Sequence, residues 1–188
     1  MEFYTLASSS AGNAALVCHE NTHILIDVGI SCRRITQSLA ALSLTLDDLD
    51  GILITHEHID HVRALGTLQK KHAIPLYASF GTAAAISYPA PYLHAFAADE
   101  TFTIKDLQIR SFRTSHDAKE SVGYRIESSD GSLAVLTDTG FITDDAHDAA
   151  LGADMLLLES NHDVIMLKNG GYPYYLKQRI LGECGHLS

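Results

Sequence analysis

Four side chains that bind metal ions well lie close together in the segment Thr55-His56-Glu57-His58-Ile59-Asp60-His61. His56 and His58 are two residues apart, so in an extended segment both imidazoles would point to the same side. Asp60 and His61 are adjacent, which suits the first turn of a helix, where neighbouring side chains diverge. A strand end followed by a helix start could therefore aim one pair of ligands at one metal ion and the second pair at a neighbouring ion. This spacing favours a metal centre over a loop that merely contains histidine.

A centre with two metal ions needs ligands from other parts of the chain, because about four ligands per ion are usual. Strand ends hold side chains more firmly than loops do, so histidine and aspartate residues at strand ends are the natural candidates. Two residues fit this description: His116 follows an expected strand at residues 107–112, and Asp138 follows another at residues 132–136. A carboxylate is the natural bridge, since each of its oxygens can bind one ion.

Alternating strands and helices are expected to position these residues. A strand at residues 50–54 precedes the motif, and an amphipathic run at residues 62–71 predicts a helix after it. The N-terminal region has the pattern of a β-meander, with turns at Gly12-Asn13 and Glu20-Asn21. Further strands are expected at residues 3–6, 14–18, 23–27, 75–78, 101–104, 122–127 and, as a buried strand, 155–158; further helices are expected at residues 31–42, 81–87 (stopped by Pro89 and Pro91), 144–150 and 172–181.

Length and cysteine usage limit the class of protein. The 188 residues are enough for one domain with a sizeable core. No apolar run reaches the roughly 18–20 residues that a membrane span needs, and the N-terminal residues have no basic segment of the kind that opens a signal peptide. The cysteines Cys18, Cys32 and Cys184 are widely spaced and form no CxxC pair. Reduced thiols and a cytoplasmic location are therefore expected.

The charge balance is acidic, with a formal net charge of −10 when histidine is neutral. A sequence-independent clamp on nucleic acid needs a basic surface, so this balance argues against such a clamp. Several of the carboxylates are candidate metal ligands, however, and bound divalent ions would offset part of the charge.

The order of the candidate ligands, HxHxDH after a strand, then a later histidine, then a strand-terminal aspartate, resembles the metallo-β-lactamase superfamily. Other segments look like its YycJ/WalJ branch: Leu6-Ala7-Ser8-Ser9-Ser10-Ala11-Gly12-Asn13, Leu25-Ile26-Asp27-Val28-Gly29, Thr137-Asp138-Thr139-Gly140, Glu159-Ser160-Asn161-His162-Asp163 and Tyr174-Tyr175-Leu176-Lys177-Gln178-Arg179-Ile180. The resemblance extends over essentially the whole chain. It implies an α/β fold of the αββα type, in which two mixed sheets pack face to face with helices outside, in a single domain at residues 1–188.

The resemblance also implies a role for each matching residue. His56, His58 and His116 would hold one metal ion, Asp60 and His61 would hold the other, and Asp138 would bridge them. The ions would be Zn²⁺, Mn²⁺ or Fe²⁺, because histidine and carboxylate ligands without cysteine suit all three.

Two residues near the expected centre have two possible roles each. Asp27 resembles the aspartate that orients a ligand histidine in the family, a role that suits the second N–H of a ligating imidazole. An aspartate at this place could also do no more than cap a turn. In the same way, Asn13 could support the centre or could only form a hairpin turn with Gly12.

The superfamily pattern ends with one further histidine that serves the second metal ion. No candidate for it lies beyond His186, and His186 itself better matches an earlier Gly-His-(Leu/Met)-(Ser/Thr) motif of the RNA-processing relatives. We therefore expect that the chain lacks the C-terminal part of the domain and, with it, one ligand of the second ion.

The branch implies a 5′-to-3′ exonuclease that acts on double-stranded DNA, with hydrolysis by a metal-activated hydroxide. Asp60 would belong to the catalytic group as a ligand of the second ion. His186 or His162 could protonate the leaving oxygen, because histidine titrates in the required range; His162 could equally have only a structural hydrogen bond. Lys177 and Arg179 follow an aromatic run and are the expected contacts to DNA phosphates or bases.

Two other functions remain open on the sequence alone. The same centre could hydrolyse a small ester, thioester or lactone, and an acidic surface suits such substrates better than DNA. The protein could also be a metal-dependent regulatory module without catalytic activity, which an incomplete second metal site would favour.

Overall fold

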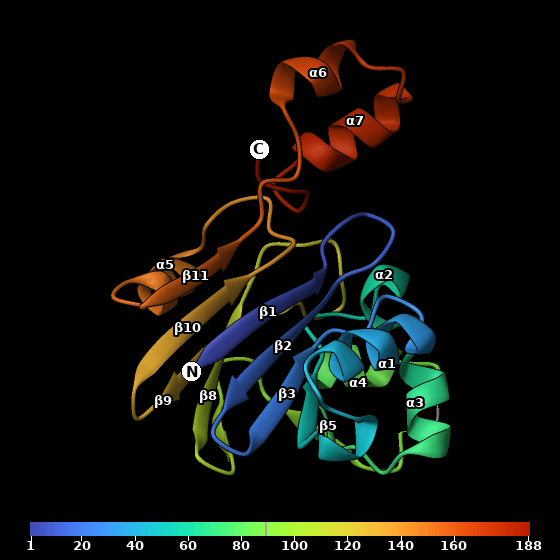
Figure 1. Cartoon of the computed structure of the whole chain (residues 1–188). Helices are drawn as coiled ribbons and strands as arrows, with labels where there is room; N and C mark the ends of the chain where they lie inside the picture. The colour runs from blue at the N-terminus through green and yellow to red at the C-terminus, as the bar shows by residue number, and fades with distance from the viewer. Residues whose placement is uncertain (89) are drawn as a thin grey trace.

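Two β-sheets packed face to face form the centre of the computed structural model, which describes residues 1–88 and 90–188. Within these ranges, the first sheet has the strand order β1-β2-β3-β4-β5-β6 and the second has the order β11-β10-β9-β8-β7 (Figure 1). The first sheet contains β1 (Glu2–Ala7), β2 (Ala14–His19), β3 (Thr22–Ile26), β4 (Gly51–Leu53), β5 (Leu76–Ser79) and β6 (Leu93–Phe96). The second contains β7 (Thr101–Ile104), β8 (Leu107–Arg113), β9 (Val122–Ser128), β10 (Gly131–Leu136) and β11 (Met155–Leu158).

Both sheets are mixed. Strands β3, β4, β5 and β6 run parallel to one another, while β1, β2 and β3 form an antiparallel meander. In the second sheet only the pair β10–β11 is parallel. The carboxyl ends of β3, β4 and β5 therefore lie at one edge of the first sheet, where polar residues that follow these strands come together.

Helices cover the outer faces of the sheets. The first sheet carries α1 (Cys32–Ala41), α2 (Ile59–Val62), α3 (Leu65–Lys71), α4 (Phe80–Ala85) and the 3₁₀ turn η1 (Leu46–Asp48). The second sheet carries α5 (Asp144–Ala150), which packs on β8, β9 and β10. The last two helices, α6 (Val164–Asn169) and α7 (Tyr174–Leu181), project from the sheets as a hairpin (Figure 1).

Three apolar layers separate these elements. Alternation along β2 shows the pattern: Leu16 faces the helices outside the first sheet, while Ala15 and Val17 face the second sheet. A third, smaller layer lies between the second sheet and α5, around Phe112 and Ala146. The αββα sandwich expected from the sequence is therefore confirmed.

Several elements differ from the sequence expectation. The helix expected at residues 62–71 is two helices, because the Ala64 N–H donates to the Val28 carbonyl oxygen and so ties the junction of α2 and α3 to the loop after β3. Strand β6 and helix α6 were not expected; both are short and weakly patterned. The buried strand expected at residues 155–158 is wrong in its burial, since Leu156 and Leu158 are exposed on the sheet edge. The helix stop expected at Pro89 lies outside the described residues.

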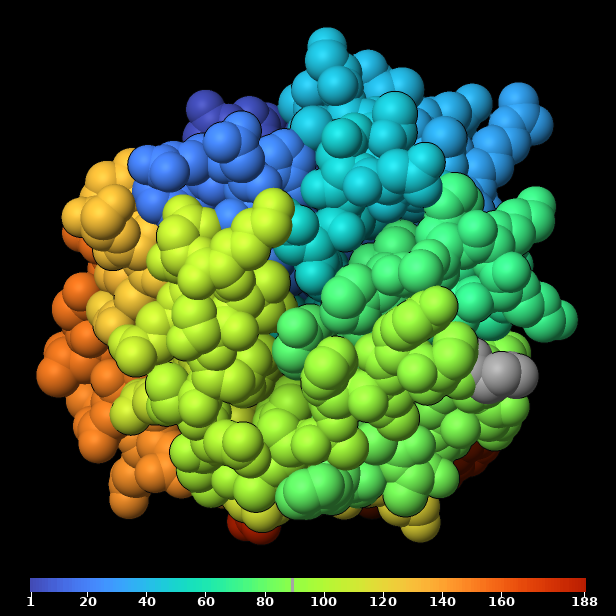
Figure 2. All heavy atoms as spheres, turned by 90° about the horizontal axis from the view of Figure 1, so that it is seen from below, coloured from blue at the N-terminus to red at the C-terminus, as the bar shows by residue number. Residues whose placement is uncertain are grey.

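The end of the molecule opposite α6 and α7 is formed by the turns that connect the strands. Figure 2, seen from below, shows a continuous surface there, with the C-terminal residues only at its edge. Among the described residues, every helix is too short or too polar to cross a membrane.

One buried hydrogen bond joins the two sheets directly beneath the histidine-rich motif. The Tyr124 hydroxyl, on β9, donates to the Ile54 carbonyl oxygen at 2.5 Å, and the Tyr124 ring is fully buried between the sheets. This bond fixes the residue at which β4 ends and the motif begins.

We expect Tyr124→Phe to lower the free energy of unfolding by about 1–3 kcal/mol, because the buried Ile54 carbonyl loses its partner. Urea denaturation followed by circular dichroism would measure the change. Tyr4→Phe is the matched control: its hydroxyl donates to Glu2 at the surface, so its loss should change stability by less than about 0.5 kcal/mol. Equal effects of the two substitutions would contradict the structural role given to Tyr124.

Candidate metal centre

The motif after β4 is held in place by backbone contacts with two other loops. The Asn13 N–H donates to the Asp60 carbonyl oxygen, and the Val28 N–H donates to the His61 carbonyl oxygen, both at 2.8 Å. Gly29 packs against the same turn so closely that a Cβ atom there would lie 1.5 Å from the Asp60 carbonyl oxygen. Only glycine fits this place, and the loops after β1 and β3 therefore form a seat for the start of α2.

The Asp27 side chain binds both ends of the segment from Thr55 to His61. It is buried at the end of β3, and its φ of 58° lies in the left-handed region, which aspartate tolerates better than most residues. Its carboxylate accepts hydrogen bonds from the Thr55 N–H at 2.9 Å, the Thr55 hydroxyl at 2.8 Å and His61 Nδ1 at 2.8 Å. The predicted orienting contact between Asp27 and a motif histidine is thus present in the structure.

Three imidazoles converge on one point. His58 Nδ1 lies 3.1 Å from His56 Nε2 and 3.2 Å from His116 Nε2. Burial and the neighbouring His61 lower the pKa of His56 well below its usual value, and burial also lowers the pKa of His116. Neutral imidazoles whose ring nitrogens face one another form a donor set that suits a cation.

A second group lies beside the first and shares His56 with it. Asp138 Oδ2 is 2.7 Å from His61 Nε2 and 3.4 Å from His56 Nε2. Like Asp27, Asp138 follows a strand and has a left-handed φ, of 53°. Burial opposes its charge, but hydrogen bonds from His186 and His61 hold the pKa of Asp138 far below its usual range.

His61 lies next to two of these carboxylates, and they change its pKa. Burial alone would lower the pKa of His61, but Asp27 on one side and Asp138 on the other raise it to about 10. His61 therefore lies between the carboxylates of Asp27 and Asp138, within the second group of donors that would hold a cation.

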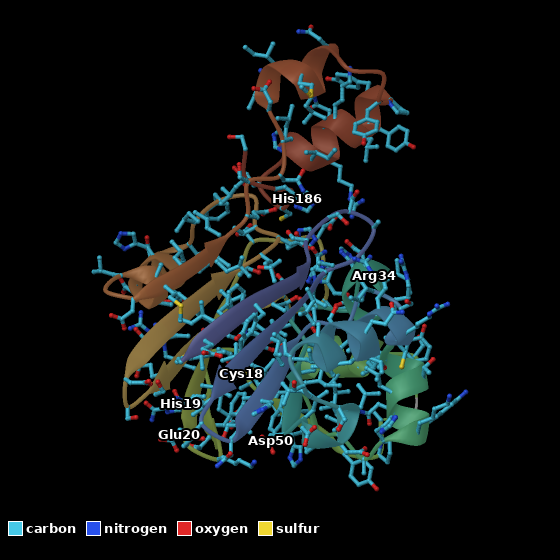
Figure 3. The ribbon with its side chains drawn as sticks, viewed as in Figure 1. Cys18, His19, Glu20, Arg34, Asp50 and His186 are labelled. Carbon is cyan, nitrogen blue, oxygen red and sulfur yellow. The ribbon has the colours of Figure 1, made fainter. Side chains whose placement is uncertain are left out.

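A third group consists of Asp138, Glu159 and His186. Asp138 and His186 were expected from the sequence, but Glu159 was not. His186 Nδ1 donates to Glu159 Oε2 at 3.0 Å and lies 3.4 Å from Asp138 Oδ1. Burial opposes protonation, but these two carboxylates raise the pKa of His186 to about 9. Glu159 also accepts from the Thr139 N–H at 2.6 Å, which fixes the loop after β10. Figure 3 shows His186 where the C-terminal segment meets the sheets.

A signal for Glu159 was available in the sequence. It directly follows the strand at residues 155–158, as Asp138 follows the strand before it, and strands β10 and β11 are parallel neighbours. The same rule that selected Asp138 would have selected Glu159.

The other predicted site residues lie at different distances from these groups. Asp60 is at the edge of the centre, with Oδ2 3.6 Å from His61 Nε2. Asn13 Nδ2 lies 3.1 Å from the same nitrogen, so the residue contacts the centre as well as forming its turn. His162 is set apart: both of its ring nitrogens are buried and have no hydrogen-bond partner within residues 1–88 and 90–188.

The two predicted basic contacts are engaged within the protein. Arg179 donates from Nε and Nη2 to the two carboxylate oxygens of Asp117, and Lys177 Nζ donates to the Lys168 carbonyl oxygen at 2.8 Å. Asp117, which sequence reasoning also missed although it follows His116, lies with Oδ1 3.4 Å from His116 Nε2. Arg179 therefore contacts the edge of the centre through Asp117.

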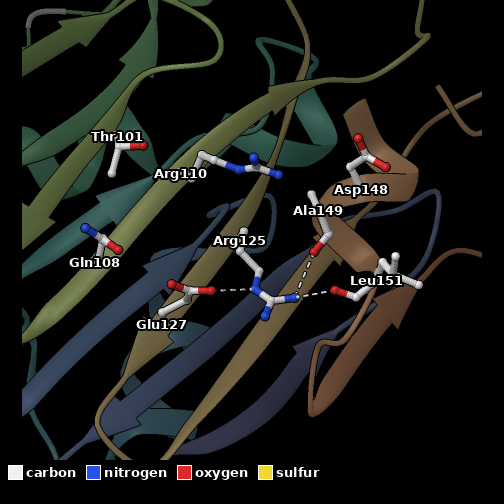
Figure 4. Close-up of a pocket in the computed structure, with 8 residues that line it drawn as sticks. All are labelled: Thr101, Gln108, Arg110, Arg125, Glu127, Asp148, Ala149 and Leu151. Carbon is white, nitrogen blue, oxygen red and sulfur yellow. Dashed lines mark hydrogen bonds and ion pairs between the residues drawn. The ribbon is translucent and has the colours of Figure 1, made fainter. Parts of the chain in front are cut away.

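A separate hollow of about 310 Å³ lies on the outer face of the second sheet (Figure 4). Arg110 and Arg125 line it, and the Arg125 guanidinium is bound to Glu127 and to the carbonyl oxygens of Ala149 and Leu151 at the end of α5. These contacts cap the helix, and the hollow contains none of the candidate ligands.

Comparison with known proteins identifies the class that this fold and this centre define. The family model described as "Beta-lactamase superfamily domain" matches residues 22–175. The chain belongs to this superfamily and is a metal-dependent hydrolase.

Within the superfamily, the chain is similar to two named enzymes along its whole length. It is 36% identical to Exodeoxyribonuclease YycJ of Bacillus anthracis, covering 100% of this chain and 73% of the relative. It is 40% identical to Exodeoxyribonuclease WalJ of Streptococcus pneumoniae, covering 100% of this chain and 72% of the relative. The chain belongs to the branch that these proteins represent, as the sequence motifs indicated.

Solved structures support the fold. Zn²⁺-bound PqqB from Methylobacterium extorquens superposes with a TM-score of 0.73 at 20% identity, covering 92% of this chain and 78% of PqqB. The metallo-β-lactamase fold protein YhfI from Bacillus subtilis superposes with a TM-score of 0.70 at 18% identity, covering 85% of this chain and 71% of YhfI.

We expect Asp27→Asn to lower metal affinity by about 10- to 100-fold, because the substitution removes the charge that orients His61. Asparagine also tolerates the left-handed φ at this position, so the backbone should be retained. Calorimetric titration of the metal-free protein with Zn²⁺ or Mn²⁺ would measure the affinity.

The matched control for this substitution is Asp47→Asn. Asp47 makes the same kind of contact, at 3.0 Å to His72 Nδ1, but at the exposed surface away from the centre. Metal affinity that falls equally in both variants, or in neither, would contradict the orienting role of Asp27.

Proposed function

We propose that this protein is an exodeoxyribonuclease that hydrolyses DNA phosphodiester bonds at the centre formed by the motif, His116 and Asp138. The similarity to the two exodeoxyribonucleases over the whole chain is the observation that carries this proposal. The proposed direction is 5′-to-3′, on double-stranded DNA. The cluster of buried histidines beside Asp138 supplies a centre suited to such chemistry.

In this proposal His56, His58 and His116 hold one divalent ion. His61 and Asp60 would hold the second, and Asp138 would be a ligand available to both. Zn²⁺, Mn²⁺ and Fe²⁺ all suit this donor set. When bound, such ions lower the pKa of a shared water and neutralise charge on the phosphate. Asp27 keeps the Nε2 of His61 directed at the centre by accepting a hydrogen bond from its Nδ1.

His186 is proposed to protonate the leaving oxygen. Its imidazole is fixed by Glu159 and lies next to Asp138, so a proton is held beside the proposed bridging ligand. His162 has no hydrogen bond to these groups among the described residues, and its ring nitrogens make no other hydrogen bond there either, so neither of its two expected roles is supported.

We expect His56→Ala to abolish degradation of duplex DNA, with a loss of more than about 10³-fold, because His56 belongs to both neighbouring donor groups. Substrates labelled at the 5′ or the 3′ end, with Mn²⁺ or Zn²⁺ present, would report both rate and direction. His147→Ala, at an exposed position on α5, is the matched control and should keep full activity. DNA that the wild-type protein leaves intact under these conditions would refute the proposal.

We expect His186→Ala to slow DNA hydrolysis by about 10²- to 10⁴-fold, because a poor leaving group needs a proton donor. Hydrolysis of bis(p-nitrophenyl) phosphate should slow much less, since p-nitrophenolate leaves without protonation. Parallel kinetics of the two substrates would measure the difference. If His162→Ala showed this selective loss and His186→Ala did not, the donor would be His162.

The alternative substrates are carboxyl compounds. We expect turnover of bis(p-nitrophenyl) phosphate to exceed turnover of a panel of thioesters, esters and lactones. The opposite order would favour the small-molecule hydrolase over the nuclease.

A further inference from the structure

The hairpin of α6 and α7 leaves the sheets at the candidate centre and returns to it. It starts after Glu159 and ends before His186, and these two side chains are hydrogen-bonded to each other. The Asn161 N–H donates to the Leu187 carbonyl oxygen at 2.9 Å, which closes the base of the hairpin. The hairpin therefore stands beside the metal centre and away from the apolar core (Figures 1 and 3).

Three tyrosines on this hairpin are exposed within the described part of the chain, which spans 72–73% of the length of the two exodeoxyribonuclease relatives. The exposed fractions are 58% for Tyr172, 76% for Tyr174 and 73% for Tyr175. No residue of α7 is buried against any part of the chain that the structure describes. A short helix gains little stability on its own, and exposed aromatic side chains close together in the chain are candidates for a binding surface.

The local charge of the hairpin is opposite to that of the protein. The whole chain has a net charge of −10, whereas residues 160–185 contain three basic side chains and two acidic side chains. Of the basic residues, Arg179 is paired with Asp117, so its charge is used within the protein. Lys168 on α6 and Lys177 on α7 have no carboxylate partner among the described residues, and Lys177 Nζ donates one hydrogen bond to the Lys168 carbonyl oxygen. Interleaved aromatic and basic side chains suit bases and phosphates.

The orientation of α7 connects the tyrosines to the centre. Tyr175 and Arg179 are four residues apart, so they lie on the same side of the helix, one turn from each other. Arg179 binds Asp117, and Asp117 lies 3.4 Å from His116 Nε2. A planar group stacked on Tyr175 would thus lie about one helical turn from the contact that reaches the centre.

We propose that Tyr172, Tyr174 and Tyr175 form a stacking surface for unpaired bases of a DNA strand, with Lys168 and Lys177 beside its phosphates. This inference rests on the proposed function and adds the substrate form: the strand that reaches the centre is single-stranded over the bases next to the cleaved bond. Stacking on tyrosine does not depend on base identity, which suits an exonuclease that must accept every sequence.

The absence of tryptophan from the sequence permits a direct test of stacking. In Tyr175→Trp the single indole reports its own surroundings. We expect its fluorescence to be quenched by a single-stranded oligonucleotide with phosphorothioate linkages, which resist hydrolysis. Tyr92→Trp is the control, because Tyr92 is exposed next to the start of β5, at the strand end away from the centre. Equal quenching at both positions would overturn the proposal.

Loss of the aromatic rings should weaken binding of bases and not of phosphates. We expect Tyr174→Ala/Tyr175→Ala to weaken binding of this oligonucleotide by at least about tenfold. Binding of an abasic oligonucleotide of equal length and charge should already be weak and should change less than about twofold. Fluorescence anisotropy of labelled oligonucleotides would measure both. An equal loss for the two oligonucleotides, or none, would overturn the stacking role.

The outcomes separate this inference from the function on which it rests. If the wild-type protein degrades DNA and the tyrosine variants bind both oligonucleotides as the wild type does, only the stacking surface is refuted. If the wild-type protein degrades no DNA, the proposed function fails. Indole emission in Tyr175→Trp that shifts to shorter wavelength with protein concentration alone, or with phosphatidylglycerol vesicles alone, would assign the surface to a second copy or to lipid and overturn the proposal.

Discussion

The buried carboxylate of Asp27 is the contact on which the geometry of the centre depends. It accepts hydrogen bonds from the Thr55 N–H, the Thr55 hydroxyl and His61 Nδ1. These bonds fix the end of β4 and the start of α2 relative to each other. A buried carboxylate with three donors is well satisfied, whereas any missing donor would leave a costly charge in the core. Asp27 therefore stabilises the edge of the first sheet and also fixes the direction of the His61 imidazole.

Much of the centre was predictable because its residues obey one rule: polar residues that follow apolar strands meet at a sheet edge. Asp27, His56 and Asp138 all follow this rule, and so does Glu159, which sequence reasoning passed over. The spacing of His56 and His58 also predicted convergence correctly. The strand positions near these residues agree with the structure to within a residue or two, since their apolar patterns are strong.

The features that were not predictable depend on contacts between distant segments. The break between α2 and α3 is set by a hydrogen bond to Val28, which no local pattern of residues 59–71 could indicate. The pairing of Arg179 with Asp117 likewise joins residues 62 positions apart. The sequence predicted that Arg179 contacts DNA and indicated no role for Asp117. Their roles follow only from the way α7 returns to the sheets.

Net charge is a poor guide to function here because the charges are unevenly distributed. Asp27, Asp138 and Glu159 are carboxylates of the centre, and each faces a histidine that becomes cationic or that could share a metal ion. Asp106 and Asp130 contact His19 at the opposite end of the first sheet. Lys168 on α6 and Lys177 on α7 belong to neither set. At physiological ionic strength, charges more than about 8 Å away are largely screened, so the local balance of the hairpin decides what it attracts.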